Sequence, residues 1–141
     1  ATEVVAMQAN PLSTTVTGLT PLVFTAKNFD THNAYNTSTG AFTCPAYGLY
    51  DVDVTVYTNS ASWTAGQVII LYVYKNSSVV GDFRNVRPAT SSVQAKIEGS
   101  MIVECNAGET ISTRSDSSIT YTADGSSLRN FFSIRRITGL R

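Results

Sequence analysis

The strongest constraint on the fold is a regular alternation of apolar and polar residues in short runs. In GLYDVDVTVY, residues 48–57, Val52, Val54 and Val56 alternate with two aspartates and a threonine. A period of two predicts a strand with one face in a core. Similar runs recur along the chain, separated by turn signals such as STG, PAYG, KNSS, NAG and ADGSS. Such a pattern is typical of an all-β, two-sheet antiparallel sandwich or jelly roll.

The predicted strands have no helical segment between them, because no stretch keeps a helical period over three turns. They cover residues 21–25, 41–44, 48–57, 67–75, 79–85, 93–104, 110–115, 118–122 and 128–138. Residues 67–75 are apolar on both faces, which predicts a central strand or one that is covered on its outside.

The chain length of 141 residues suits a single domain, and no linker or internal repeat divides it. Residues 1–19 are rich in Thr, Ala and Asn and are interpreted as an N-terminal arm, with the folded domain at 20–141. The first ten residues lack the pattern of an intact secretory signal. Apolar runs stay shorter than the ~18 residues of a transmembrane helix, so no membrane role is expected.

Charge and chemistry argue against several function classes. Only 14% of the residues are charged and the formal net charge is zero, so nucleic acid is not an expected partner. His32 is the only histidine, and no nucleophile–base motif or metal-ligand spacing accompanies it. We therefore expect no enzyme activity, no cofactor and no metal. Cys44 and Cys105 are either a disulfide pair or two buried thiols. Both readings stay open, because the pairing of cysteines depends on distances and directions that the sequence does not give.

Five pieces of the chain, in order, resemble the globular C1q domain of the C1q/tumour-necrosis-factor superfamily. They are PLVFTA (21–26), AYNTSTGAFTCPAYGLY (34–50), LYVYKNSSVV (71–80), GSMIVECNAGETI (99–111) and NFFSIRRI (130–137). The second is the most specific, with its Phe-x-Cys-Pro-x-x-Gly-x-Tyr core. These 141 residues contain no collagen-like Gly-X-Y stretch, and Arg135 and Arg136 stand where the family usually has apolar residues. The resemblance implies a jelly roll that assembles as a homotrimer through its heads.

The resemblance also implies where the trimer contacts lie. In the family, the strand at 48–57 lies beside the closing strand, and their shared outer face meets neighbouring subunits. The residues that would face a partner are Asp51, Asp53, Thr55, Tyr57, Phe131, Ser133, Arg135 and Ile137. Arg135 would meet Asp51 or Asp53, within one chain or across the interface. Solvated surface is the alternative reading of the two aspartates.

Two functions fit such a head. The first is a trimeric structural protein on the virion surface, a capsid cement or decoration protein of a virus or phage. It would dock through a basic C-terminus that includes Arg129, Arg136 and Arg141. The second is an extracellular receptor- or glycan-binding head, which would use loop aromatics such as Trp63 and Tyr47. Alternatively, Trp63 is a packed anchor of its loop. The arginines fit equally well in a terminal strand that is simply exposed to solvent.

Overall fold

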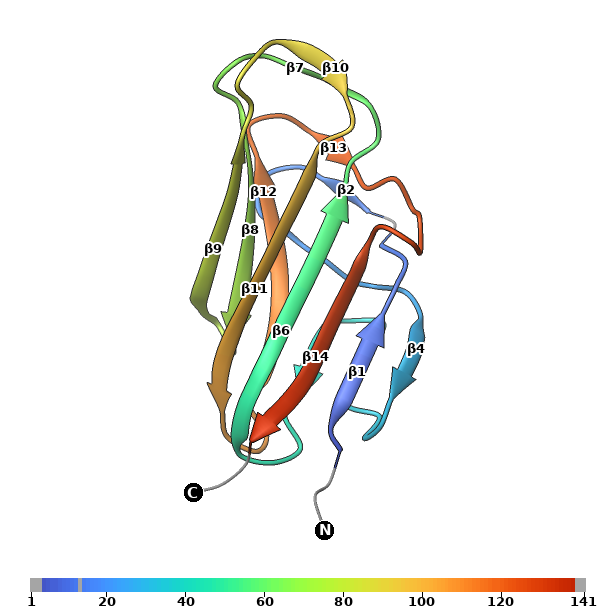
Figure 1. Ribbon diagram of the computed structural model, residues 1–141, viewed down its shortest axis with the longest axis vertical. Coiled ribbons are helices and arrows are strands. Elements are labelled where there is room, and N and C mark those ends of the chain that lie inside the picture. Colours follow the sequence, from blue (N-terminus) through green and yellow to red (C-terminus); the bar gives the residue numbers. More distant parts are fainter. Residues whose placement is uncertain (1–3, 13, 139–141) are drawn as a thin grey trace.

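The computed structural model describes residues 4–12 and 14–138, and two antiparallel sheets face each other in it. Sheet I has the order β11 (Lys96–Cys105), β6 (Gly48–Tyr57), β14 (Phe131–Thr138), β1 (Ala6–Ala9) and β4 (Lys27–Asp30). Sheet II has the order β3 (Thr20–Pro21), β12 (Thr110–Ser117), β8 (Val68–Lys75) and β9 (Ser78–Val86), and β5 (Phe42–Thr43) also pairs with β12. Figure 1 shows sheet I in front of sheet II.

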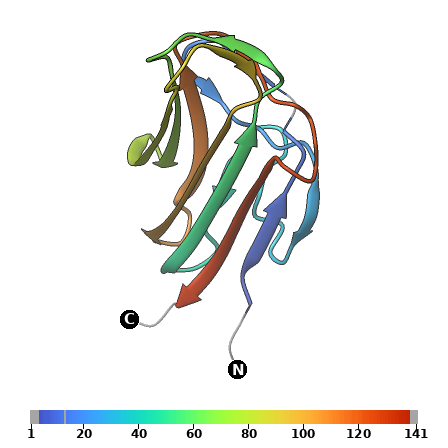
Figure 2. The ribbon, with the colours of Figure 1, turned by 45° about the horizontal axis from the view of Figure 1, so that its top comes forward.

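Two short pairs complete the strands: β10 (Ser91–Val93) with β7 (Ala61–Trp63), and β13 (Tyr121–Thr122) with β2 (Thr15–Val16). In Figures 1 and 2 the β7–β10 pair covers one end of the sandwich, opposite the end where β1 begins and β14 finishes. The described part of the chain contains no helix, and hence none that could cross a membrane. The prediction of an all-β jelly roll is confirmed.

The core lies between the sheets, where the alternating side chains predicted to point inward are buried. Val52, Val54 and Val56 of β6 are all in it. Aromatic rings fill the space between the layers: the ring centroids of Phe24 and Phe132 are 5.8 Å apart, and those of Phe42 and Tyr50 are 5.9 Å apart. Large aromatic side chains thus pack between the two sheets.

The N-terminal segment differs from the expected arm. Residues 6–9 form β1, which lies inside sheet I between β14 and β4. Met7 and Ala9 are buried, and Val16 of β2 also belongs to the core. The polar composition of residues 1–19 concealed this strand, because four residues carry too little alternation to be recognised.

The other strands agree with expectation to different degrees. The long strands lie where the alternation predicted them, and β6 has the expected bounds, 48–57. Of the predicted strand 21–25, only Pro21 lies in a strand, β3, and Phe24 makes a single bridge to Leu12. Of the predicted strand 118–122, only Tyr121–Thr122 lies in one. The sequence pattern did not predict β1, β2, β4, β7 or β10 as separate strands. As predicted, β8 is central: it lies between β12 and β9.

Phe83 closes the open edge of the sandwich between β9 and β11. Gly99 has no side chain, and a Cβ atom there would lie only 2.3–2.5 Å from carbon atoms of the Phe83 ring. A Cβ at Gly81 would similarly clash with the sulfur of Met101. The two glycines therefore let β9 and β11 side chains interlock at this edge.

Candidate functional site

The outer face of sheet I carries the residues expected at a trimer interface. We use "outer face" for the side chains of this sheet that point away from the core. Cross-strand register places Phe131 opposite Thr55, Ser133 opposite Asp53 and Arg135 opposite Asp51. Six of the eight expected interface residues therefore form one continuous patch. That this patch forms a trimer interface remains a prediction.

Tyr57 and Ile137 lie at the two ends of this patch. Cationic groups flank the Tyr57 ring, with Lys96 Nζ 5.8 Å and the Arg129 guanidinium carbon 5.9 Å from its centroid. Ile137 is half exposed. The patch thus ends in a cation-flanked aromatic ring on one side and an aliphatic side chain on the other.

Arg135 meets Asp51 within the chain, at 3.2 Å from Nε to Oδ2. The Arg135 side chain is 72% exposed and that of Asp51 19%. An ion pair so open to water contributes little by itself, about 1 kcal/mol or less. The charge of Asp51 on the outer face is thus paired within the chain.

Three polar residues cross the middle of the outer face. The Asn28 amide donates to Gln8 Oε1 at 2.7 Å, and the Gln8 amide donates to Ser133 Oγ at 3.4 Å. Gln8 and its cross-strand neighbour Phe29 were not among the expected site residues. Gln8 falls in the expected arm, and Phe29 lies outside the predicted strands. The alternation of Met7, Gln8 and Ala9 was the only signal for them.

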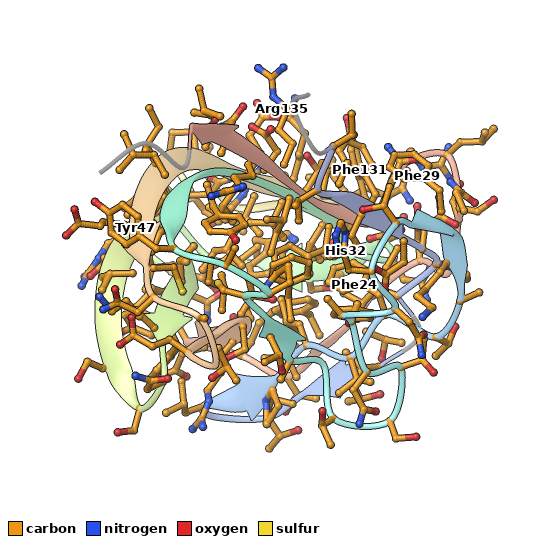
Figure 3. All side chains as sticks on the ribbon, turned by 90° about the horizontal axis from the view of Figure 1, so that it is seen from below. Phe24, Phe29, His32, Tyr47, Phe131 and Arg135 are labelled. Carbon is orange, nitrogen blue, oxygen red and sulfur yellow. The ribbon has the colours of Figure 1, made fainter. Side chains whose placement is uncertain are left out.

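Apolar side chains and hollows also mark this face. Phe29 is 49% and Ile102 58% exposed. A hollow of about 550 Å³ is lined by side chains that include Thr55, Ser100 and Phe131, and it reaches Phe83. A second, of about 210 Å³, lies between Phe29, Ser133 and Arg135. Figure 3 shows Arg135, Phe131 and Phe29 along this side of the sandwich, while Phe24 lies between the layers.

The arginines expected to dock a partner have contacts inside the chain. Arg129 pairs with Asp124 at 2.8 Å, and Arg136 donates through Nε and a terminal nitrogen to the Tyr47 carbonyl. Arg136 is half-buried. Because its guanidinium binds the Tyr47 carbonyl, it stabilises the turn that leads into β6. Arg141 lies outside the described residues. The basic patch expected from the C-terminal arginines is therefore already engaged at two of its three positions.

The aromatic residues expected to bind a ligand are also engaged. Trp63 is 1% exposed, and its indole N–H donates to the Val93 carbonyl at 3.2 Å. It is a packed anchor of the β7–β10 pair, and its ring is not open to a ligand. The Tyr47 hydroxyl donates to Glu104 Oε2 at 2.8 Å, near the surface.

The described residues contain no group of three His, Cys, Asp or Glu side chains placed to hold a metal ion. His32 Nδ1 lies 2.8 Å from Thr31 Oγ1. It lines a polar hollow of about 600 Å³ with Lys27, Asn33 and Asn36. Cys44 and Cys105 are both free thiols and both buried.

Two buried carboxylates have a structural role. Burial raises the pKa of Asp30, but hydrogen bonds from the amides of Ala34 and Tyr35 and from Lys27 outweigh it, so the pKa is lowered. The pKa of Asp124 is lowered in the same way: burial is outweighed by donors from Ser126, Arg129 and Asn130. Both acids are thus held ionised to organise loops.

One family model matches the sequence that forms this sandwich. The C1q domain model matches residues 5–133. The chain belongs to the C1q domain family. The match begins just before β1, so the N-terminal strand is part of the C1q domain.

Solved structures support this C1q domain fold at low sequence identity. The globular domain of zebrafish complement 1qA is 16% identical, with 98% of this chain and 100% of that chain covered and a TM-score of 0.64. The Eiger TNF of S. frugiperda is 11% identical, with coverage of 99% and 96% and a TM-score of 0.72. Murine APRIL at pH 5.0 is 9% identical, with coverage of 96% and 100% and a TM-score of 0.69. A comparison with curated protein sequences gives no significant match.

Proposed function

We propose that this C1q domain is a non-enzymatic head that assembles as a homotrimer through the outer face of sheet I. C1q and TNF-type domains are generally non-enzymatic and often trimeric. The observation that carries the proposal is the character of this face, where Phe29 and Ile102 are exposed beside two hollows. Side chains of a neighbouring copy would fill the hollows and cover the apolar groups. Closed three-fold symmetry would bury this face in every copy.

We further propose that the trimer is a structural component on a larger particle, such as a decoration protein on a virion. The first and last strands, β1 and β14, lie side by side in sheet I, so both terminal strands belong to the same part of the head. The alternative, a receptor- or glycan-binding head, loses the aromatic platform expected for it, because Trp63 is packed inside.

Mass spectrometry of purified particles from the source would detect the chain if the decoration role is right. A chain found only free in the medium would argue for the recognition head.

The trimer is tested by the solution mass of the purified chain, measured by light scattering behind a sizing column. We expect three times the chain mass of 15.2 kDa. Ser133 lies at the junction of the two hollows, so Ser133→Arg should shift the mass to that of one chain by placing a long cation there.

The matched control is Ser112→Arg, on the outside of sheet II opposite Tyr74, which should leave the mass unchanged. A wild-type chain that stays monomeric at high concentration would refute the proposed assembly. So would a Ser133→Arg variant that remains trimeric.

A further inference from the structure

Cys44 and Cys105 lie where two corners of the chain run side by side. Residues 44–48 lead from β5 in sheet II to β6 in sheet I. Residues 105–109 lead back from β11 in sheet I to β12 in sheet II. Each corner begins with a cysteine, so one thiol comes from each sheet.

Main-chain hydrogen bonds tie each cysteine to the other corner. The Cys44 N–H donates to the Glu109 carbonyl at 2.8 Å, and the Cys44 carbonyl accepts from the Gly108 N–H at 2.9 Å. Cys105 is the register partner of Gly48, which ends the first corner. The positions of both cysteines are therefore set by the same small set of backbone contacts.

The two side chains share one buried end of the core. Cys44 is 1% and Cys105 0% exposed, and both belong to the main hydrophobic cluster. A hydrogen bond with Cys105 and burial raise the pKa of the Cys44 thiol. The same contact lowers the pKa of Cys105, against the effect of its burial. The two thiols are thus in contact at this end of the core.

We propose that Cys44 and Cys105 are an intrachain disulfide site that covalently joins the two sheets when the chain folds in oxidising surroundings. With oxidised glutathione as the oxidant, one of the two cysteine thiolates attacks a glutathione sulfur while the chain folds and releases one glutathione thiolate. The other cysteine thiolate then attacks the cysteine sulfur of this mixed disulfide and releases the second glutathione thiolate. The chain loses two protons and two electrons, which the oxidant takes up as two molecules of reduced glutathione.

The two redox states would differ in stability. A bond between residues 44 and 105 closes a long loop, which restricts the unfolded chain more than a short loop would. We expect the oxidised chain to melt about 10 °C above the reduced chain. In reducing surroundings the two thiols remain small apolar core residues, which is compatible with the same packing. The site would thus strengthen the head outside a cell without changing its fold.

The test is to unfold the full chain with reductant and refold it in a buffer of reduced and oxidised glutathione. Intact-mass spectrometry after alkylation in denaturant then counts the free thiols. We expect a single chain that is 2 Da lighter than the reduced chain and takes up no alkylating agent. Two alkylated cysteines, a glutathione adduct, or a disulfide between chains would each overturn the proposal.

Two variants make the test specific. Cys44→Ser leaves Cys105 without its partner, so this chain should instead carry one alkylated or glutathione-bound cysteine. The double variant Cys44→Ala/Cys105→Ala should melt at the same temperature with and without reductant. Because the thiol count is made on the wild-type chain, it stands even if a variant folds poorly.

Discussion

At the scale of single residues, the absence of a side chain at Gly99 allows β9 and β11 to meet. Gly99→Ala should lower the free energy of unfolding by about 1–3 kcal/mol, because the new methyl group would overlap the Phe83 ring. Urea denaturation followed by circular dichroism measures the loss.

The partner of this contact provides the control. Adding Phe83→Leu to Gly99→Ala should recover part of the stability, since the smaller side chain can move aside. If the two substitutions were simply additive, the clash would not be the cause of the loss.

Two carboxylates make the stability of this C1q domain depend on pH. The folded-state pKa values of Asp30 and Asp124 are lowered. A carboxyl group with a lowered folded-state pKa stabilises the fold at pH values above its unfolded pKa of about 3.9. This stabilisation is lost as the pH falls through the folded-state pKa. We therefore expect the free energy of unfolding to decrease when the pH is lowered below about 4.

Replacing these acids should remove part of that dependence. Asp30→Asn and Asp124→Asn should lower stability at pH 7 and flatten its dependence on pH between 4 and 2, as measured by urea titration at each pH. An unaltered acid slope in both variants would show that other carboxylates dominate.

At the scale of elements, β1 is the part whose role the sequence concealed. Met7 of β1 is buried and pairs with Ile134 and Asp30. Met7→Ala should therefore cost about 2–5 kcal/mol of stability, as expected for a core side chain. The neighbouring Gln8→Ala removes a side chain from the outer face and should cost about 1 kcal/mol or less in the isolated chain. Equal, small effects for both would mean that residues 6–9 behave as a loose arm.

At the scale of the whole molecule, assembly should be coupled to folding. If the trimer is the folded species, its apparent melting temperature should rise by roughly 3 °C for each tenfold increase in chain concentration. Differential scanning fluorimetry over a range of concentrations measures this slope, and Ser133→Arg should abolish it. A melting temperature independent of concentration would contradict a trimer that unfolds as it dissociates.

The sequence by itself determined the fold class and the faces of the long strands. Period-two alternation depends only on neighbouring residues, so it assigned Val52, Val54 and Val56 to the core and Asp51 and Asp53 to the outer face. Five ordered motifs indicated the C1q family, and the family model agrees. Parity and the family resemblance placed Arg135 on the same face as Asp51 and Asp53, and the register of the structure selects Asp51.

Only the tertiary structure decided which polar and aromatic groups remain available. Trp63 in a polar loop and Arg136 in a basic tail look exposed in sequence, yet contacts with Val93 and Tyr47 occupy them. The strand at residues 6–9 and the meeting of Cys44 with Cys105 likewise depend on segments more than 60 residues apart. Local pattern reports the burial of one face, whereas the partner of a side chain is set by which distant segments the fold brings beside it.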